Sequence, residues 1–78
     1  MLQKISELKT KIESHLNLLE KDEKYKFFKE KDEILLSTRL FLRDDLEKSL
    51  QSVGQDNLPQ RYAAYIEIEN NLQGLINA

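Results

Sequence analysis

Residues 20–33 read EKDEKYKFFKEKDE, and eleven of these fourteen positions are charged. Six are acidic and five are basic, with only Tyr25, Phe27 and Phe28 among them. Mixed signs at this density are typical of a solvated helix surface, where opposite charges pair four residues apart. The segment also separates two apolar patterns, and their relative phase decides whether the chain is one long helix or several packed helices.

The two apolar patterns point in different directions around a helix axis. Before the charged segment, the spacing of three and four predicts a helix over residues 2–20; after it, a second stripe predicts a helix over residues 22–53. The first stripe consists of Leu2, Ile5, Leu8, Ile12, Leu16 and Leu19, and the second of Phe28, Leu35, Leu42, Leu46, Leu50 and Val53. At about 100° per residue, Phe28 lies about 180° around the helix from Leu19. One straight helix would carry stripes on opposite sides, so we expect a break near residues 20–24 that turns the stripes toward each other.

The clearest punctuation follows the second stripe. Residues 53–59 read VGQDNLP, in which Gly54 can end a helix in the left-handed conformation and Pro59 suits the first turn of another. A further apolar stripe then predicts a third helix over residues 58–77. This stripe consists of Leu58, Tyr62, Tyr65, Leu72 and Ile76. Asp22 is the N-cap candidate for the second helix.

These boundaries predict an all-α chain with one domain over residues 1–78. We expect a three-helix antiparallel bundle with a long central helix. That helix is apolar on all sides between residues 34 and 42, so we expect this stretch to be buried all round. A chain of 78 residues buries only about 60–65% of its unfolded surface, which favours completing the core by self-association.

Composition narrows the possible functions. The net charge is −2 and there is no cysteine, so the chain is not built to neutralise phosphates and has no thiolate metal ligand. The single histidine excludes a histidine-based metal cluster within one chain, and the adjacent Asp44 and Asp45 point about 100° apart on a helix. We therefore expect no metal, no cofactor, no small-molecule substrate and no enzymatic activity.

The sequence also indicates where in the cell the protein is located. No apolar run approaches the roughly 20 residues of a membrane-spanning helix, and the first residues lack the apolar region of a signal peptide. We expect a cytoplasmic protein that does not enter a membrane.

Three polar residues fall on or beside the apolar stripes: His15, Arg39 and Glu69. We favour positions at the stripe edges, from which each side chain reaches solvent. A buried polar cluster of the three is the alternative.

The candidate partner-binding residues lie at the two ends of the central helix, where we expect a neighbouring helix on one side only. They are Tyr25, Phe27 and Phe28 at one end, and Leu46, Leu50 and Val53 at the other. Apolar surface beside polar rims often marks an interaction site. We therefore expect a non-enzymatic protein–protein interaction module, such as a small adaptor or chaperone-like protein that binds an amphipathic helix or self-associates as in a coiled coil.

Two other functions stay open. One is a small inhibitor, immunity protein or antitoxin, whose acidic C-terminal helix would block a basic surface of a partner protein. The other is a dimeric nucleic-acid-associated regulator, although the lysines are interleaved with acids. In a homodimer or constitutive heteromer, we expect one of Tyr25, Phe27 and Phe28 to lie in the contact.

Overall fold

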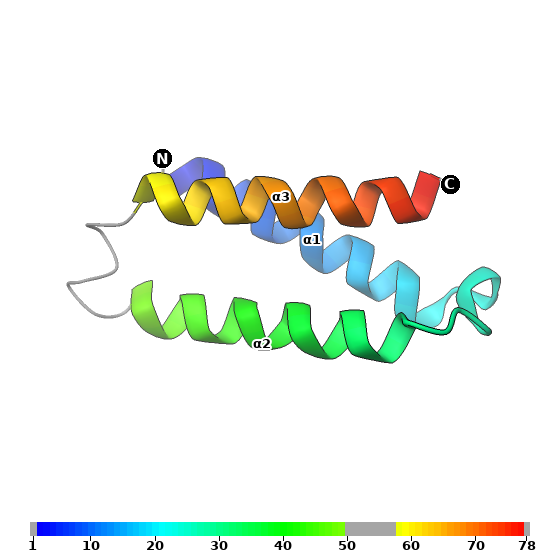
Figure 1. Cartoon of the computed structure of the whole chain (residues 1–78). Coiled ribbons are helices and arrows are strands. Elements are labelled where there is room, and N and C mark those ends of the chain that lie inside the picture. Colours follow the sequence, from blue (N-terminus) through cyan, green and yellow to red (C-terminus); the bar gives the residue numbers. More distant parts are fainter. Residues whose placement is uncertain (1, 50–57, 78) are drawn as a thin grey trace.

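The computed structural model describes residues 2–49 and 58–77, and within them the chain is all-α. Its elements are α1 (Leu2–Lys21), the 3-10 turn η1 (Glu23–Tyr25), α2 (Lys31–Ser49) and α3 (Leu58–Asn77). Figure 1 shows that α1 and α3 run in the same direction and that α2 runs opposite to both. The predicted three-helix bundle is confirmed. Within the described ranges, no helix is both long and apolar enough to cross a membrane.

The break after the first helix is confirmed, but the second helix begins later than predicted. It starts at Lys31 rather than at Asp22, which instead caps η1 by accepting a hydrogen bond from the Lys24 amide at 2.9 Å. Asp32 and Glu33 occupy the first turn of α2, where carboxylates stabilise the positive end of the helix dipole. The predicted long central helix is therefore wrong at its N-terminal side.

The lengths of the described helices are nearly equal: 20 residues for α1, 19 for α2 and 20 for α3. The predicted extension of the central helix to residue 53, and the turn signals at Gly54 and its neighbours, lie outside the described residues.

The turn between α1 and α2 closes one end of the bundle. Tyr25 is buried there, and its hydroxyl donates a hydrogen bond to the backbone carbonyl of Ile76 at 3.2 Å. Phe28 packs against the same core. The 3-10 geometry thus turns two aromatic rings inward while the neighbouring lysines stay exposed.

The core is centred on α1 and α3. Every fully buried apolar residue of the three α-helices belongs to a predicted stripe: Ile5, Ile12, Leu16 and Leu19 in α1, Leu35 and Leu42 in α2, and Tyr65 and Leu72 in α3. Contact between α1 and α3 is extensive, and contact between α1 and α2 is much smaller.

The expectation that residues 34–42 are buried all round is wrong. Leu36 is 63% exposed and Leu40 is 39% exposed. The buried residues of α2 share one side of the helix. The two neighbouring helices therefore cover α2 on this face only. That face consists of Leu35, Thr38, Leu42 and Asp45.

Candidate functional site

A groove of about 410 Å³ lies between α1 and α2. Figure 1 shows α1 near α2 at their connecting turn and farther from it toward the start of α1. The floor is apolar, with Leu16 and Leu42 buried, while Leu46 remains 48% exposed. An apolar floor open along one side is the shape that a fourth helix could fill.

The rims of this groove are polar and mostly basic. Lys9, Glu13 and Asn17 line it from α1, and Arg39 and Arg43 line it from α2. Three of these four charged side chains are cationic, and of these Arg39 pairs with Glu20 and Arg43 contacts Asp44.

One rim residue also ties the two helices together. Arg39 donates a hydrogen bond to Glu20 at 2.6 Å. This hydrogen bond, with the charge of Arg39, holds the pKa of the Glu20 carboxyl below its usual range. Both side chains are substantially solvent-exposed, so the pair orients Arg39 more than it stabilises the fold.

A second cavity of about 190 Å³ adjoins the groove at Lys9 and Leu46. Its wall includes a hydrogen-bonded network between α2 and α3. Arg61 donates to both carboxylate oxygens of Asp45, at 2.7 and 2.8 Å, and the Tyr65 hydroxyl donates to the same carboxylate at 2.6 Å. The Tyr65 ring also meets the Phe41 ring edge to face, with 5.3 Å between centroids.

The charges of this network follow from its burial and hydrogen bonding. Burial alone would raise the pKa of the Asp45 carboxyl, but hydrogen bonds from Arg61 and Tyr65 hold it below the usual range. Burial and the bond to Asp45 raise the pKa of the Tyr65 hydroxyl. Asp45, only 6% exposed, is thus a paired carboxylate, and this network suits a structural role.

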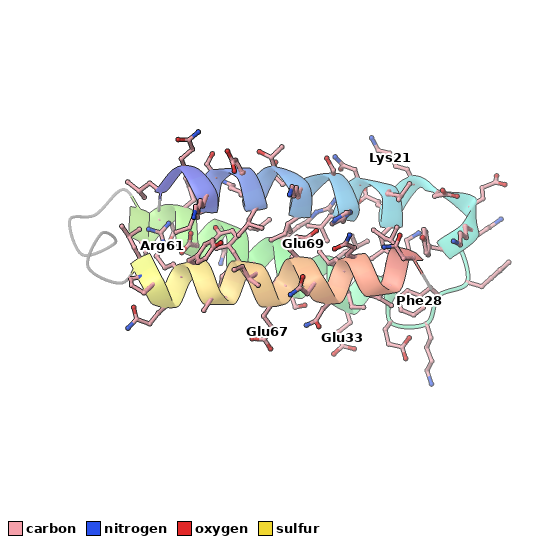
Figure 2. The ribbon with its side chains drawn as sticks, turned by 90° about the horizontal axis from the view of Figure 1, so that it is seen from above. Lys21, Phe28, Glu33, Arg61, Glu67 and Glu69 are labelled. Carbon is pink, nitrogen blue, oxygen red and sulfur yellow. The ribbon has the colours of Figure 1, made fainter. Side chains whose placement is uncertain are left out.

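The predicted aromatic site is only partly accessible. Tyr25 is buried in its own chain and Phe28 is half-buried, whereas Phe27 is 90% exposed. Figure 2 shows Phe28 near the C-terminal end of α3. A cavity of about 370 Å³, lined by all three aromatic residues with Leu19 and Leu75, is present at this end. Phe27 is the most exposed of the three, with the Lys26 ammonium 5.6 Å from its ring centroid, and the contact of these residues with a partner stays a prediction.

The second predicted site is described in part. Leu46 belongs to the groove between α1 and α2, which places it at a candidate binding surface. Leu50 and Val53 lie outside the described residues.

The polar residues on the stripes form pairs rather than a cluster of three. His15 Nε2 lies 3.0 Å from the Glu69 carboxylate, linking α1 to α3. Arg39 is engaged with Glu20 on the other side of α1. The predicted alternative of one cluster is therefore wrong, and His15 and Glu69 are partly buried, with 23% and 13% of their side chains exposed.

Within the parts of the chain that the structure describes, no three His, Asp or Glu residues are placed to hold a metal ion. Figure 2 shows Glu67 and Glu69 on opposite sides of α3. Asp44 is exposed whereas Asp45 is buried, so the second carboxylate pair diverges as well.

Comparison with known proteins brings no relative: no family model, no curated protein and no solved structure matches the chain. The function must therefore be inferred from the surface of the bundle itself.

Sequence reasoning missed most of the groove. Its lining residues, such as Leu16 and Leu42, come from two separate helices, and a groove depends on the angle between helices, which no single helix pattern contains. Sequence reasoning also missed the pairing of Asp45 with Arg61, for which opposite charges on two neighbouring helices are the only signal in the sequence.

Proposed function

We propose that this chain is a non-enzymatic protein-interaction module whose groove between α1 and α2 binds an amphipathic helix with acidic flanks. The observation that carries the proposal is the open, apolar floor of Leu16, Leu42 and Leu46 beneath basic rims. A bound helix would bury Leu46 and would pack against α1 and α2 as a fourth helix of the bundle.

The charge of the rims supports the choice of ligand. Lys9 and Arg43 stand on opposite sides of the groove and both are cationic. Opposite charge on the ligand would speed encounter and select against basic helices. Binding should therefore weaken as salt is added, because Arg43 is exposed to solvent and Lys9 is partly exposed.

The test uses two synthetic helical peptides with the same leucine face, one with glutamate and one with lysine on its polar face. We expect the acidic peptide to bind and the basic one to bind much more weakly in calorimetric titrations. Amide and methyl NMR shifts should change at Leu16, Leu42 and Leu46. Failure of the acidic peptide to bind at millimolar concentration would contradict the proposal.

A matched pair of variants locates the binding site. Leu46→Asp puts a charge into the groove and should abolish binding, and its half-exposed position lets the fold tolerate the change. Leu36→Asp makes the same chemical change on the exposed outer side of α2 and should leave binding intact. Equal loss in both variants would mean that the peptide does not occupy the groove.

The alternative functions have less support. An inhibitor that acts through an acidic α3 has few charges to use, because Glu69 pairs with His15 and only Glu67 among the α3 acids is exposed. A nucleic-acid regulator would need a basic face, and the lysines around η1 are interspersed with exposed acids.

A further inference from the structure

The exposed side of α2 carries a second regular pattern. Leu36 and Leu40 are one helical turn apart, and both are exposed. Glu33, Arg43 and Glu47, also exposed, continue the alternating spacing of three and four, so all five residues share one face. Figure 2 shows Glu33 projecting outward. We call these five residues the outer stripe.

The outer stripe is complementary to itself when one copy is turned end for end. When the two-fold axis passes at position 38, midway between the two leucines, Leu36 lies opposite the partner's Leu40. The same register sets Glu33 opposite the partner's Arg43, which gives two pairs of opposite charge around four leucines. A parallel arrangement would instead oppose each charge to its own copy.

Neither charge has a strong partner within its own chain. Among the described residues, Glu33 forms no ion pair, and Arg43 makes only a 3.3 Å contact with its neighbour Asp44, in which both side chains are exposed. The two leucines likewise stay exposed to solvent, Leu36 at 63% and Leu40 at 39%. The stripe therefore has both unburied apolar surface and unused charge.

We propose that a second copy of this chain packs antiparallel on the outer stripe, with a two-fold axis passing between the two α2 helices. Such an isologous contact uses the same residues on both copies and closes on itself. The proposal does not depend on a ligand in the groove, although Arg43 belongs both to the groove rim and to the outer stripe. Contact through one helix face is small against the roughly 1,200–2,000 Å² of stable interfaces, so the dimer should be weak and concentration-dependent.

Reversal of the charges tests the register. Glu33→Arg and Arg43→Glu each set like charges against each other at two places, and each should raise the dissociation constant about tenfold or more. The double variant E33R/R43E should restore association. A mixture of the two single variants should also associate, because both pairs are then of opposite charge across the axis. Sedimentation equilibrium from micromolar to millimolar concentration measures all four cases.

Three further variants distinguish this surface from others. Leu36→Lys should abolish association, whereas Phe27→Ala, which removes an exposed ring elsewhere, and Leu46→Asp, which blocks the groove, should leave it unchanged. Circular dichroism confirms that each variant keeps its helices. A wild-type chain that stays monomeric at millimolar concentration, or association that charge reversal does not change, would overturn the proposal. Loss of association in Phe27→Ala would move the contact to the aromatic turn and overturn it too.

Discussion

The helix α1 is attached to its two neighbours by different kinds of interaction. Toward α3 it packs apolar side chains closely, and the His15–Glu69 pair lies beside this contact. Toward α2 it contributes the floor of an open groove, Leu16 against Leu42, and the exposed ion pair of Glu20 with Arg39. The difference shows that burial holds α1 and α3 together, while α2 is held more by directional polar contacts.

The strongest of those polar contacts joins α2 to α3 through Asp45, Arg61 and Tyr65. Apolar burial is spread over many atoms and loses little when one contact shifts. A buried charge pair is concentrated in two groups, and loss of one leaves the other unpaired. The attachment of α2 should therefore be sensitive to single changes in this network.

The largest expected effect comes from breaking the network. Asp45→Ala leaves the Arg61 guanidinium buried without its carboxylate, which should cost about 3–5 kcal/mol of unfolding free energy. That is a large part of the total stability of so small a domain. Asp44→Ala, next to it but exposed, should cost less than about 0.5 kcal/mol in the same urea titration. Similar values for both would show that α2 does not depend on the network.

Truncating one leucine in the α1–α3 core and one on the floor of the α1–α2 groove compares the packing of these two interfaces directly. Leu72→Ala, in the packed core, should cost about 3–5 kcal/mol, and Leu42→Ala, on the groove floor, nearer to 2 kcal/mol. The groove lets water and neighbouring side chains occupy the space vacated by Leu42, whereas Leu72 leaves an enclosed cavity. The reverse order in urea denaturation would mean that α2 is the better-packed helix.

Acid should weaken the attachment of α2 selectively. The pKa of Asp45 is lower in the folded chain than in the unfolded chain, so its stabilisation is present above the unfolded value of about 4 and is lost as pH falls through the folded value. The stability difference between wild type and Asp45→Asn should be constant near neutral pH and should shrink below about pH 4. A difference that is independent of pH down to pH 2 would contradict the pairing.

The smallest expected effect on stability comes from a substitution in α3, which belongs to the closely packed pair of helices. Gly74 lies within α3, and a Cβ added there would meet no atom within 4 Å. Gly74→Ala should therefore stabilise the chain by about 0.5–1 kcal/mol, because alanine is the better helix former. A modest rise in melting temperature by circular dichroism would show it, and a decrease would mean that the end of α3 is not a regular helix.

Much of the fold was predictable because apolar periodicity is a local property. The stripes of α1 and α3 correctly marked Ile12, Leu16, Tyr65 and Leu72 as core, and the phase change at the charged segment correctly required a turn. The predicted start of α2 is wrong because Asp22 caps η1 and not this helix. The acidic residues Asp32 and Glu33 were the better signal of a first turn.

The candidate sites were less predictable, since they depend on how helices are placed. His15 and Glu69 each interrupt a stripe, but only the alignment of α1 with α3 shows that they face each other. The many apolar residues around Leu36 and Leu40 predicted that α2 is buried on all sides, but both leucines are exposed. Such a pattern leads to burial on all sides only if enough helices surround α2. The number of neighbours is a property of the whole bundle, which no single helix pattern contains.

The parallel course of α1 and α3 also determines how the bundle would respond to mechanical force. In Figure 1 the start of α1 and the end of α3 lie at opposite ends of the bundle. A pull applied at Leu2 and Asn77 would slide the two helices along each other, so that the tension is shared by all contacts between them at once. Helices pulled apart from the same end would instead separate one contact at a time. The closely packed contact between α1 and α3 is therefore loaded in shear when the chain is pulled at these two residues, and this is the direction in which the protein resists extension best.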